Sequence, residues 1–146
     1  FQRKDNWTHF TADEQRTLMT LWAIARSPLI LGGDLPQTDG ATLRLVTNRD
    51  VLAVDQRSTG NRELLRRPDG LIVWTADVPG APGERYLAFF NTSDQQLTTA
   101  DLTPTKLGLP GQVRWRNLWT GGDDDQHPPS SLAPHACALY RVTPRG

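Results

Sequence analysis

The spacing of apolar residues changes near Gly60, and this change constrains the fold more than any other feature of the chain. Before Gly60, apolar residues recur every three or four positions, as in helices that pack on one face. After Gly60, short runs rich in β-branched and aromatic residues are separated by clusters of Pro, Gly and Asp, as in antiparallel strands joined by turns. The sequence therefore predicts two parts, residues 1–58 and residues 59–146.

A well-marked helix is predicted near the start of the chain. Thr11 and Glu14 form a capping-box pattern, in which the two side chains bond to backbone N–H groups that the first helical turn leaves free. The buried stripe of this helix is predicted from residues at spacings of three, four and seven: Leu18, Leu21, Trp22 and Ala25, with Met19 at its edge.

The helix is predicted to end at Ser27-Pro28, because the residue before a proline avoids the helical region. Leu29–Leu31 is then a continuous apolar run closed by Gly32-Gly33, which suits a strand buried on both faces of a parallel sheet. Further helices are predicted within Gly40–Val46 and Asn48–Gln56. Helix, buried strand and helix in succession are typical of a β/α barrel or a doubly wound sheet. One strand cannot make a sheet, so its partners are expected from sequence outside this chain.

The second part is predicted to be an antiparallel β-sandwich. Its strand that begins at Val113 alternates apolar and polar residues, so one face of the strand packs and the other faces solvent. We expect residues 60–146 to fold on their own, because a stretch of this length can form a domain. The predicted strands are Leu71–Trp74, Tyr86–Phe90, Val113–Trp119 and Ala136–Val142.

One family resembles this chain over nearly its whole length. The string TADEQRTLMTLWAIARSPLILGGDL, Thr11–Leu35, is similar to the end of the catalytic barrel in glycoside hydrolase family 27, the α-galactosidase or melibiase family. The resemblance is weakest in the loops. Beyond Leu35, the resemblance continues through Thr42–Gln56, Val73–Ala76, Tyr86–Asn91, Arg116–Trp119 and Pro134–Val142.

The resemblance implies a fold and an activity. The fold is the C-terminal helix-strand-helix portion of a (β/α)8 barrel followed by an antiparallel β-sandwich. The activity is retaining hydrolysis of terminal α-galactosides, or of α-N-acetylgalactosamine in some members, without a cofactor. The implied partners are a carbohydrate substrate, bound by the complete barrel, and the missing N-terminal portion of that barrel. The family's catalytic aspartates lie on earlier barrel strands whose motifs are absent here, so no catalytic residue is assigned. A chain that begins at Phe1 is expected to be a fragment or a processed product.

Two residues are candidates for substrate contact. Asp34 follows the predicted barrel strand directly, at the end where barrel enzymes keep their chemistry. The alternative is a purely structural role, in which the Asp34 carboxylate accepts backbone hydrogen bonds in the following turn. Trp7 precedes the first helix and can line a loop at the barrel mouth, where aromatic rings suit sugars. Retaining hydrolysis needs two carboxyl groups about 5–5.5 Å apart, so Asp34 alone would supply half of a mechanism.

Other reactive residue types in the sequence favour structural roles. Asp123–Asp125 lacks the ligand spacing of a calcium loop and is expected to be a solvated hairpin, so no metal site is predicted. The three histidines share no metal-ligand spacing, and His135 is expected to be a hydrogen-bonded structural residue. Cys137 lies among small apolar residues, which predicts an inert buried thiol.

A second hypothesis is a carbohydrate-binding or purely structural β-sandwich without catalysis. Trp74, Trp115 and Trp119 could stack on sugars if they were exposed, or could fill the core. Residues 11–56 separate the two hypotheses, because a free-standing sugar-binding module would not need them. Sixteen basic and sixteen acidic residues give a formal net charge of zero, so nucleic acid and anionic membranes are not expected partners.

Overall fold

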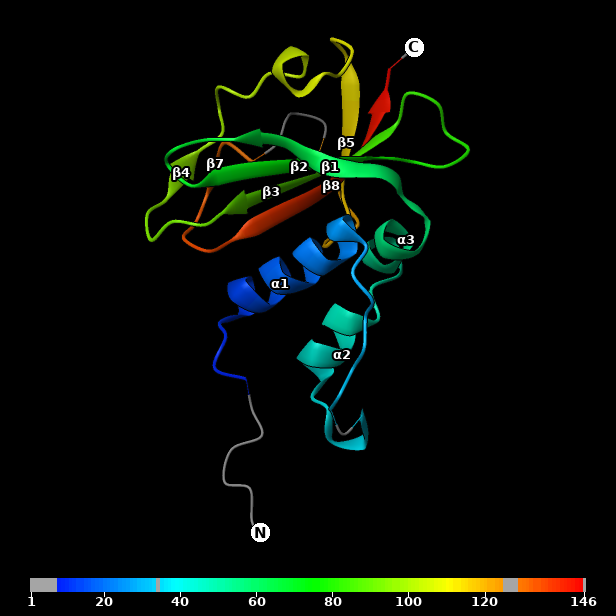
Figure 1. The fold of residues 1–146 in the computed structure, drawn as a ribbon, viewed down its shortest axis with the longest axis vertical. Coiled ribbons are helices and arrows are strands. Elements are labelled where there is room, and N and C mark those ends of the chain that lie inside the picture. The colour runs from blue at the N-terminus through cyan, green and yellow to red at the C-terminus, as the bar shows by residue number, and fades with distance from the viewer. Residues whose placement is uncertain (1–7, 34, 125–128, 146) are drawn as a thin grey trace.

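A six-stranded antiparallel sheet forms the middle layer of the protein, with helices on one side of it (Figure 1). The computed structural model describes residues 8–33, 35–124 and 129–145. The helices are α1 (Ala12–Ala25), α2 (Gly40–Val46) and α3 (Arg49–Arg57), with short 3₁₀ turns at Leu35–Gln37 and Thr105–Leu107. None of the described helices is long and apolar enough to cross a membrane.

The start of α1 confirms the predicted capping box. Thr11 Oγ1 accepts a hydrogen bond from the Glu14 amide at 3.2 Å, and Glu14 Oε2 accepts one from the Thr11 amide at 2.7 Å. These bonds to Thr11 hold the pKa of the Glu14 carboxyl below its ordinary value. The helix ends at Ala25, where Arg26 adopts the left-handed conformation with φ of 55°. Both other predicted helices, α2 and α3, are also present.

The face of α1 that packs on the sheet differs from the predicted stripe. The buried residues are Met19, Thr20, Ala23 and Ile24, whereas Leu21 and Trp22 are each 40% exposed. The small side chains of Thr20 and Ala23 let the helix approach the sheet closely. Met19 and Ile24 are the large apolar side chains on this face, whereas Leu18 is only partly buried and Leu21 and Trp22 lie on the more exposed sides of α1.

The strands pair in the order β1-β2-β3-β8-β5-β6, and β4 and β7 form a separate two-stranded sheet. The four predicted strands correspond to β2, β3, β5 and β8. The sequence pattern missed β1, because this edge strand carries charged residues where a half-buried strand would alternate. The eight described strands are β1 (Thr59–Arg66), β2 (Leu71–Asp77), β3 (Arg85–Asn91), β4 (Leu97–Thr98), β5 (Val113–Asn117), β6 (Asp123–Asp124), β7 (Ser131–Leu132) and β8 (Cys137–Pro144).

Two sequence expectations about strands are corrected. Leu29–Leu31 forms no strand in the described part of the chain, since no neighbouring strand is there to pair with it. The strand predicted over Val113–Trp119 ends earlier, because β5 stops at Asn117 and the following turn carries Trp119 to the helix side of the sheet, opposite Trp115. Helix α3 ends at Arg57 and β1 begins at Thr59, and a domain boundary between residues 58 and 59 stays a prediction.

Both faces of the six-stranded sheet are buried. One face packs against β4, β7 and the loop that carries the second 3₁₀ turn, with Val73, Phe89 and Trp115 at its centre. Trp115 and Tyr140 meet edge to face there, with ring centroids 5.5 Å apart. The other face packs against α1 and α3. This helix-side core contains Met19, Ala23, Ile24, Val51, Val54, Ala76, Val78, Tyr86, Ala88, Phe90, Leu118 and Leu139.

Thr20 joins α1 to the sheet through its hydroxyl group. The hydroxyl donates to the Arg16 carbonyl at 2.8 Å and accepts from the Trp119 indole Nε1 at 2.9 Å. The Cys137 Sγ lies 3.2 Å from the same oxygen. Since the hydroxyl proton already points at the helix, its lone pairs are left for the indole and the thiol. One side chain thus satisfies two polar groups from the sheet side.

Two further hydrogen bonds fasten the helices to the sandwich. The Thr17 hydroxyl donates to the His135 carbonyl at 2.7 Å, just before β8 begins. The Asn48 side-chain amide donates to the Leu118 carbonyl at 3.0 Å, while its oxygen caps α3. The helices α1 and α3 are therefore part of the same packed body as the sheet.

This packing argues against the expectation that residues 60–146 fold on their own. Deleting residues 1–57 would expose the sheet face that carries Ala76, Ala88, Phe90 and Leu139, and apolar surface costs about 25 cal/mol per Å² when it is left in water. We expect the truncated chain to lose its cooperative thermal transition, measured by circular dichroism. A sharp transition with the midpoint of the full chain would contradict this expectation.

The Thr20 hydroxyl gives a second test. Thr20→Val keeps the shape of the side chain but leaves the Trp119 indole N–H without its partner, which costs about 1–3 kcal/mol of unfolding free energy. Thr47→Val is the matched control, because Thr47 makes the same local bond to a carbonyl four residues back but is exposed. Urea denaturation should separate the two variants. Equal stability of both would show that the hydroxyl does not hold α1 on the sheet.

Candidate functional site

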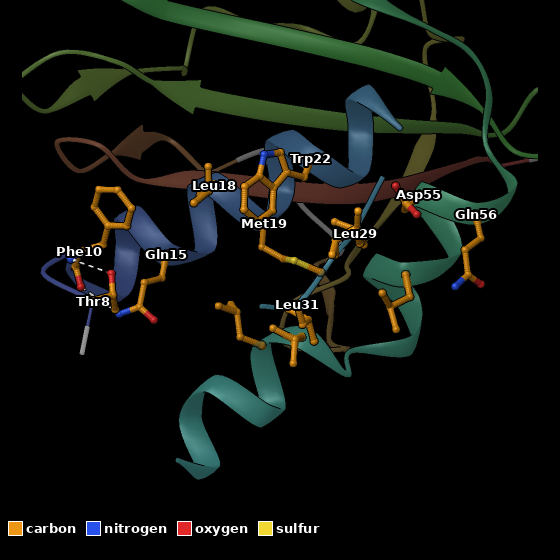
Figure 2. A pocket seen from close by; sticks show the side chains of 14 residues that line it. Thr8, Phe10, Gln15, Leu18, Met19, Trp22, Leu29, Leu31, Asp55 and Gln56 are labelled. Carbon is orange, nitrogen blue, oxygen red and sulfur yellow. Dashed lines mark hydrogen bonds between the residues drawn. The ribbon is translucent and has the colours of Figure 1, made fainter. Parts of the chain in front are cut away.

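An open apolar groove lies on the side of α1 that faces away from the sheet (Figure 2). Its volume is about 470 Å³, and its walls come from α1, α2, α3 and the segment around Leu29–Leu31. The lining residues are Thr8, Phe10, Gln15, Leu18, Met19, Trp22, Leu29, Ile30, Leu31, Leu45, Val46, Leu52, Asp55 and Gln56.

The outer side of α1 forms one wall of the groove. Leu18 and Trp22, which were predicted to lie in a core, are four residues apart and line the groove together with Met19. Across from them, Ile30 is 86% exposed and Leu31 is 52% exposed. Exposed apolar side chains gathered in one place mark a surface that packs against something else. Leu21 and Trp22 are each 40% exposed in this chain, while Leu18 and Leu29 are partly buried.

Polar groups lie at the two ends of the groove. Thr8 and Gln15 are at one end, and Asp55 and Gln56 of α3 are at the other (Figure 2). Burial raises the pKa of the Asp55 carboxyl, and the charge of Arg26 partly opposes this shift. Asp55 is the only carboxylate among the lining residues that the structure describes. Among the described lining residues, Asp55 therefore has no second carboxyl with which to hydrolyse a glycoside in the retaining manner.

Sequence reasoning did not single out Asp55. The only signal in the sequence is spacing, because Asp55 lies three residues after Leu52 and so on the same side of α3, but only the packing of α3 shows that this side lines the groove. The apolar residues Val51, Leu52 and Val54 drew attention to the buried side of α3 instead. The two residues that the sequence did propose for substrate contact, Trp7 and Asp34, lie outside the described residues and stay predictions.

The described residues of the aspartate run at 123–125 belong to a hairpin. Asp123 and Asp124 form β6, which pairs with Arg116 and Trp115 of β5. Asp125 and His127 lie outside the described residues. Across the part of the chain that the structure describes, no three His, Cys, Asp or Glu side chains are grouped so that they could hold a metal ion. A metal-ligand set therefore has no support among these residues.

His135 and Cys137 have structural surroundings. His135 Nε2 lies 2.9 Å from Asp94 Oδ1, and the His135 carbonyl accepts the Thr17 hydroxyl, so this residue is hydrogen-bonded as predicted. Burial raises the pKa of the Cys137 thiol, which disfavours the reactive thiolate. Cys137 is partly buried against the helix-side core, and its Sγ lies 3.2 Å from the Thr20 hydroxyl oxygen. Neither residue is arranged for catalysis.

The sandwich tryptophans are buried or partly buried. Trp115 is 1% exposed, and Trp74 and Trp119 are both partly buried against the helix-side core. A stacking platform for sugars needs an open aromatic face. These three residues therefore serve the core of the sandwich.

Two family models match different parts of the chain, one the strand-rich part and the other the helical part. Residues 68–142 match a family model described as the alpha galactosidase C-terminal beta sandwich domain, and residues 7–57 match a model described as alpha galactosidase A. An α-galactosidase of Oryza sativa subsp. japonica is 31% identical over 90% of this chain and 32% of its own length. An α-galactosidase of Cyamopsis tetragonoloba is 30% identical over 92% of this chain and 34% of its own length.

Solved structures are similar over nearly the whole chain. A protein of Bacillus halodurans, provisionally assigned as an α-N-acetylgalactosaminidase, has a TM-score of 0.86 and 37% identity over 98% of this chain and 34% of its own. A β-L-arabinopyranosidase of Geobacillus stearothermophilus, solved with arabinose, has a TM-score of 0.86 and 36% identity over 99% of this chain and 33% of its own. The chain thus spans about a third of the length of these relatives. It belongs to the α-galactosidase family, glycoside hydrolase family 27, and corresponds to the C-terminal portion of its members.

Proposed function

We propose that this chain is the last part of the barrel, together with the β-sandwich, of a retaining glycosidase that cleaves terminal α-galactosides. The catalytic carboxyl groups belong to the part of the barrel that precedes this region. The role of this chain is then to close the barrel and to support it from the sandwich side. Its partner is the remainder of the barrel, which packs against the groove.

The exposed apolar lining of the groove is the observation that carries this proposal. Ile30 and Leu31 follow α1 directly, in the place where a barrel strand follows a helix. Both side chains are more than half exposed, and burying each of them would contribute about 1.5–3 kcal/mol. A strand neighbour on either side of Leu29–Leu31 would provide that burial and would also satisfy the backbone of the segment. In a parallel sheet covered by helices, each inner strand is buried on both faces and hydrogen-bonded on both edges.

The chemistry of the reaction supports an inactive fragment. Retaining hydrolysis needs one carboxylate to attack the anomeric carbon and a second carboxyl to protonate the departing oxygen. The described part of the groove offers only Asp55, whose carboxyl sits on a helix rather than at the end of a barrel strand. Barrel enzymes carry their catalytic groups at those strand ends. Asp55 is therefore assigned no catalytic role.

The substrate has two candidates. The plant relatives are α-galactosidases, which favours a terminal α-galactoside. The structural relative from Geobacillus stearothermophilus is somewhat more identical and is a β-L-arabinopyranosidase, which makes the corresponding pentoside the second candidate. Arabinopyranose and galactose share their ring hydroxyl pattern and differ in the exocyclic carbon. A sugar-binding module without catalysis is less favoured, because Trp115 is buried and Trp74 and Trp119 pack partly buried against the helix-side core.

A chimera tests the proposal. This chain would replace the corresponding third of the Oryza sativa α-galactosidase, and release of p-nitrophenol from the α-galactoside would be measured. We expect the chimera to fold and to hydrolyse the substrate, whereas this chain alone releases no p-nitrophenol. Ile30→Asp in the chimera should abolish activity, because a charge would be buried where an apolar side chain belongs.

The matched control is Leu43→Asp. Leu43 is also an exposed apolar residue of the helical part, at 38%, but it does not line the groove. Activity that survives in Leu43→Asp and is lost in Ile30→Asp would support the packing of the barrel on the groove. Full activity of Ile30→Asp, or turnover by this chain alone, would contradict the proposal.

A further inference from the structure

The sequence Asn91-Thr92-Ser93 at the end of β3 matches the acceptor motif for N-linked glycosylation, Asn-x-Ser/Thr. In that modification the Asn amide nitrogen forms a bond to C1 of a sugar, and the bond from C1 to a lipid-linked diphosphate breaks. The amide gives up one proton to a base of the transferase. The attached glycan is bulky and lies on the protein surface. The motif alone therefore predicts an exposed asparagine in a loop.

The structure places Asn91 in the interior instead. Its side chain is only 1% exposed. The side-chain Nδ2 donates to the carbonyls of Gln95, Leu132 and Ala133 at 2.7, 3.1 and 2.9 Å. An amide nitrogen carries two hydrogens, so both are used and one is shared between two carbonyls. Neither hydrogen of Nδ2 is left for a transferase to remove.

The other polar atoms of Asn91 are also engaged. Its Oδ1 accepts from the amide and the hydroxyl of Ser93 at 2.9 Å each, so the serine of the motif forms a turn with its own asparagine. The backbone amide of Asn91 donates to the Ala136 carbonyl at 3.0 Å. Asn91 thus joins the β3–β4 loop to the connection between β7 and β8. All these partners belong to this chain, and further protein packed around them would not uncover Asn91.

We propose that Asn91 is an acceptor for N-linked glycosylation only before the sandwich folds, and that its three donor bonds close the site afterwards. A glycan on Nδ2 replaces one of the two hydrogens and must pass between the β3–β4 loop and the β7–β8 connection. These two segments then cannot close on each other, and buried carbonyls lose their donor. Modification of Asn91 and folding of the sandwich therefore exclude each other. This inference does not depend on which glycoside the family members cleave.

A glycosylation reaction in vitro tests the proposal. The folded full chain and a synthetic peptide of residues 86–106 would each be incubated with a purified oligosaccharyltransferase and a lipid-linked oligosaccharide. Trypsin releases the same peptide from the chain, and mass spectrometry gives the occupancy of Asn91. The other motif of this kind, Asn6-Trp7-Thr8, falls in a different tryptic peptide.

We expect the synthetic peptide to be modified at Asn91. Occupancy in the folded chain should be lower by on the order of 100-fold, because access to Asn91 requires the two segments to open. Equal occupancy in the chain and the peptide would overturn the closure of the site. A peptide that stays unmodified would overturn the claim that Asn91 is an acceptor.

Gln96→Asn provides a matched control, because it creates a second acceptor motif with Leu97 and Thr98 in the same part of the chain. Gln96 is exposed, whereas Asn91 is buried. We expect the folded variant to be modified at position 96 and not at Asn91. If position 96 also stays unmodified, the segment as a whole excludes the enzyme, and the assignment to the bonds of Asn91 is overturned.

Two variants separate the donor bonds from the motif. Asn91→Asp keeps the shape of the side chain but has no N–H group for the three carbonyls, so it should markedly lower the urea midpoint or abolish the transition. Ser93→Ala removes the motif and leaves those three bonds in place. Its midpoint should stay close to that of the unchanged chain, while the corresponding peptide should no longer be modified. An unchanged midpoint in Asn91→Asp, or an equal lowering by Ser93→Ala, would overturn the proposal.

Discussion

The six-stranded sheet has two apolar faces, and the rest of the structure depends on covering both. Successive side chains of a strand point to opposite sides, so Leu87 and Phe89 of β3 face the small sheet while Ala88 and Phe90 face the helices. The small sheet and its loops cover one face, and α1 and α3 cover the other. A sandwich cut from its helices would leave the second face in water. The helical and strand-rich parts of the sequence are therefore parts of one packed body.

Helix α1 has apolar residues on two sides, and only one of these sides is covered by the sheet. The small residues Thr20 and Ala23 allow the helix to approach the sheet, and Thr20 also satisfies the Trp119 indole. The larger residues Leu18 and Trp22 then face the other way, into the groove. A helix with two apolar sides is suited to lie between two layers. In this chain one of those layers is the sandwich, and the proposed second layer is the remainder of the barrel.

Sequence reasoning predicted elements better than contacts. The capping box at Thr11, the helices α2 and α3 and the strands with β-branched and aromatic runs are local patterns, and all of them are present. The buried face of α1 was wrong because periodicity identifies an apolar stripe but not which of two layers it meets. The strand at Leu29–Leu31 needs neighbours that this chain lacks, and β1 has no apolar alternation to reveal it. Asp55 was missed because its place in the groove depends on how α3 packs.

The shared core of α1, α3 and the six-stranded sheet implies that these elements unfold together. Equilibrium urea denaturation of the full chain, followed in the same samples by tryptophan fluorescence and far-ultraviolet circular dichroism, tests it most directly. Fluorescence reports on the surroundings of all five tryptophans, of which Trp115 is buried in the sheet, and circular dichroism reports on helix and strand content. We expect one transition with the same midpoint for both signals. Two separate transitions, with helix lost before the tryptophan environment changes, would contradict it.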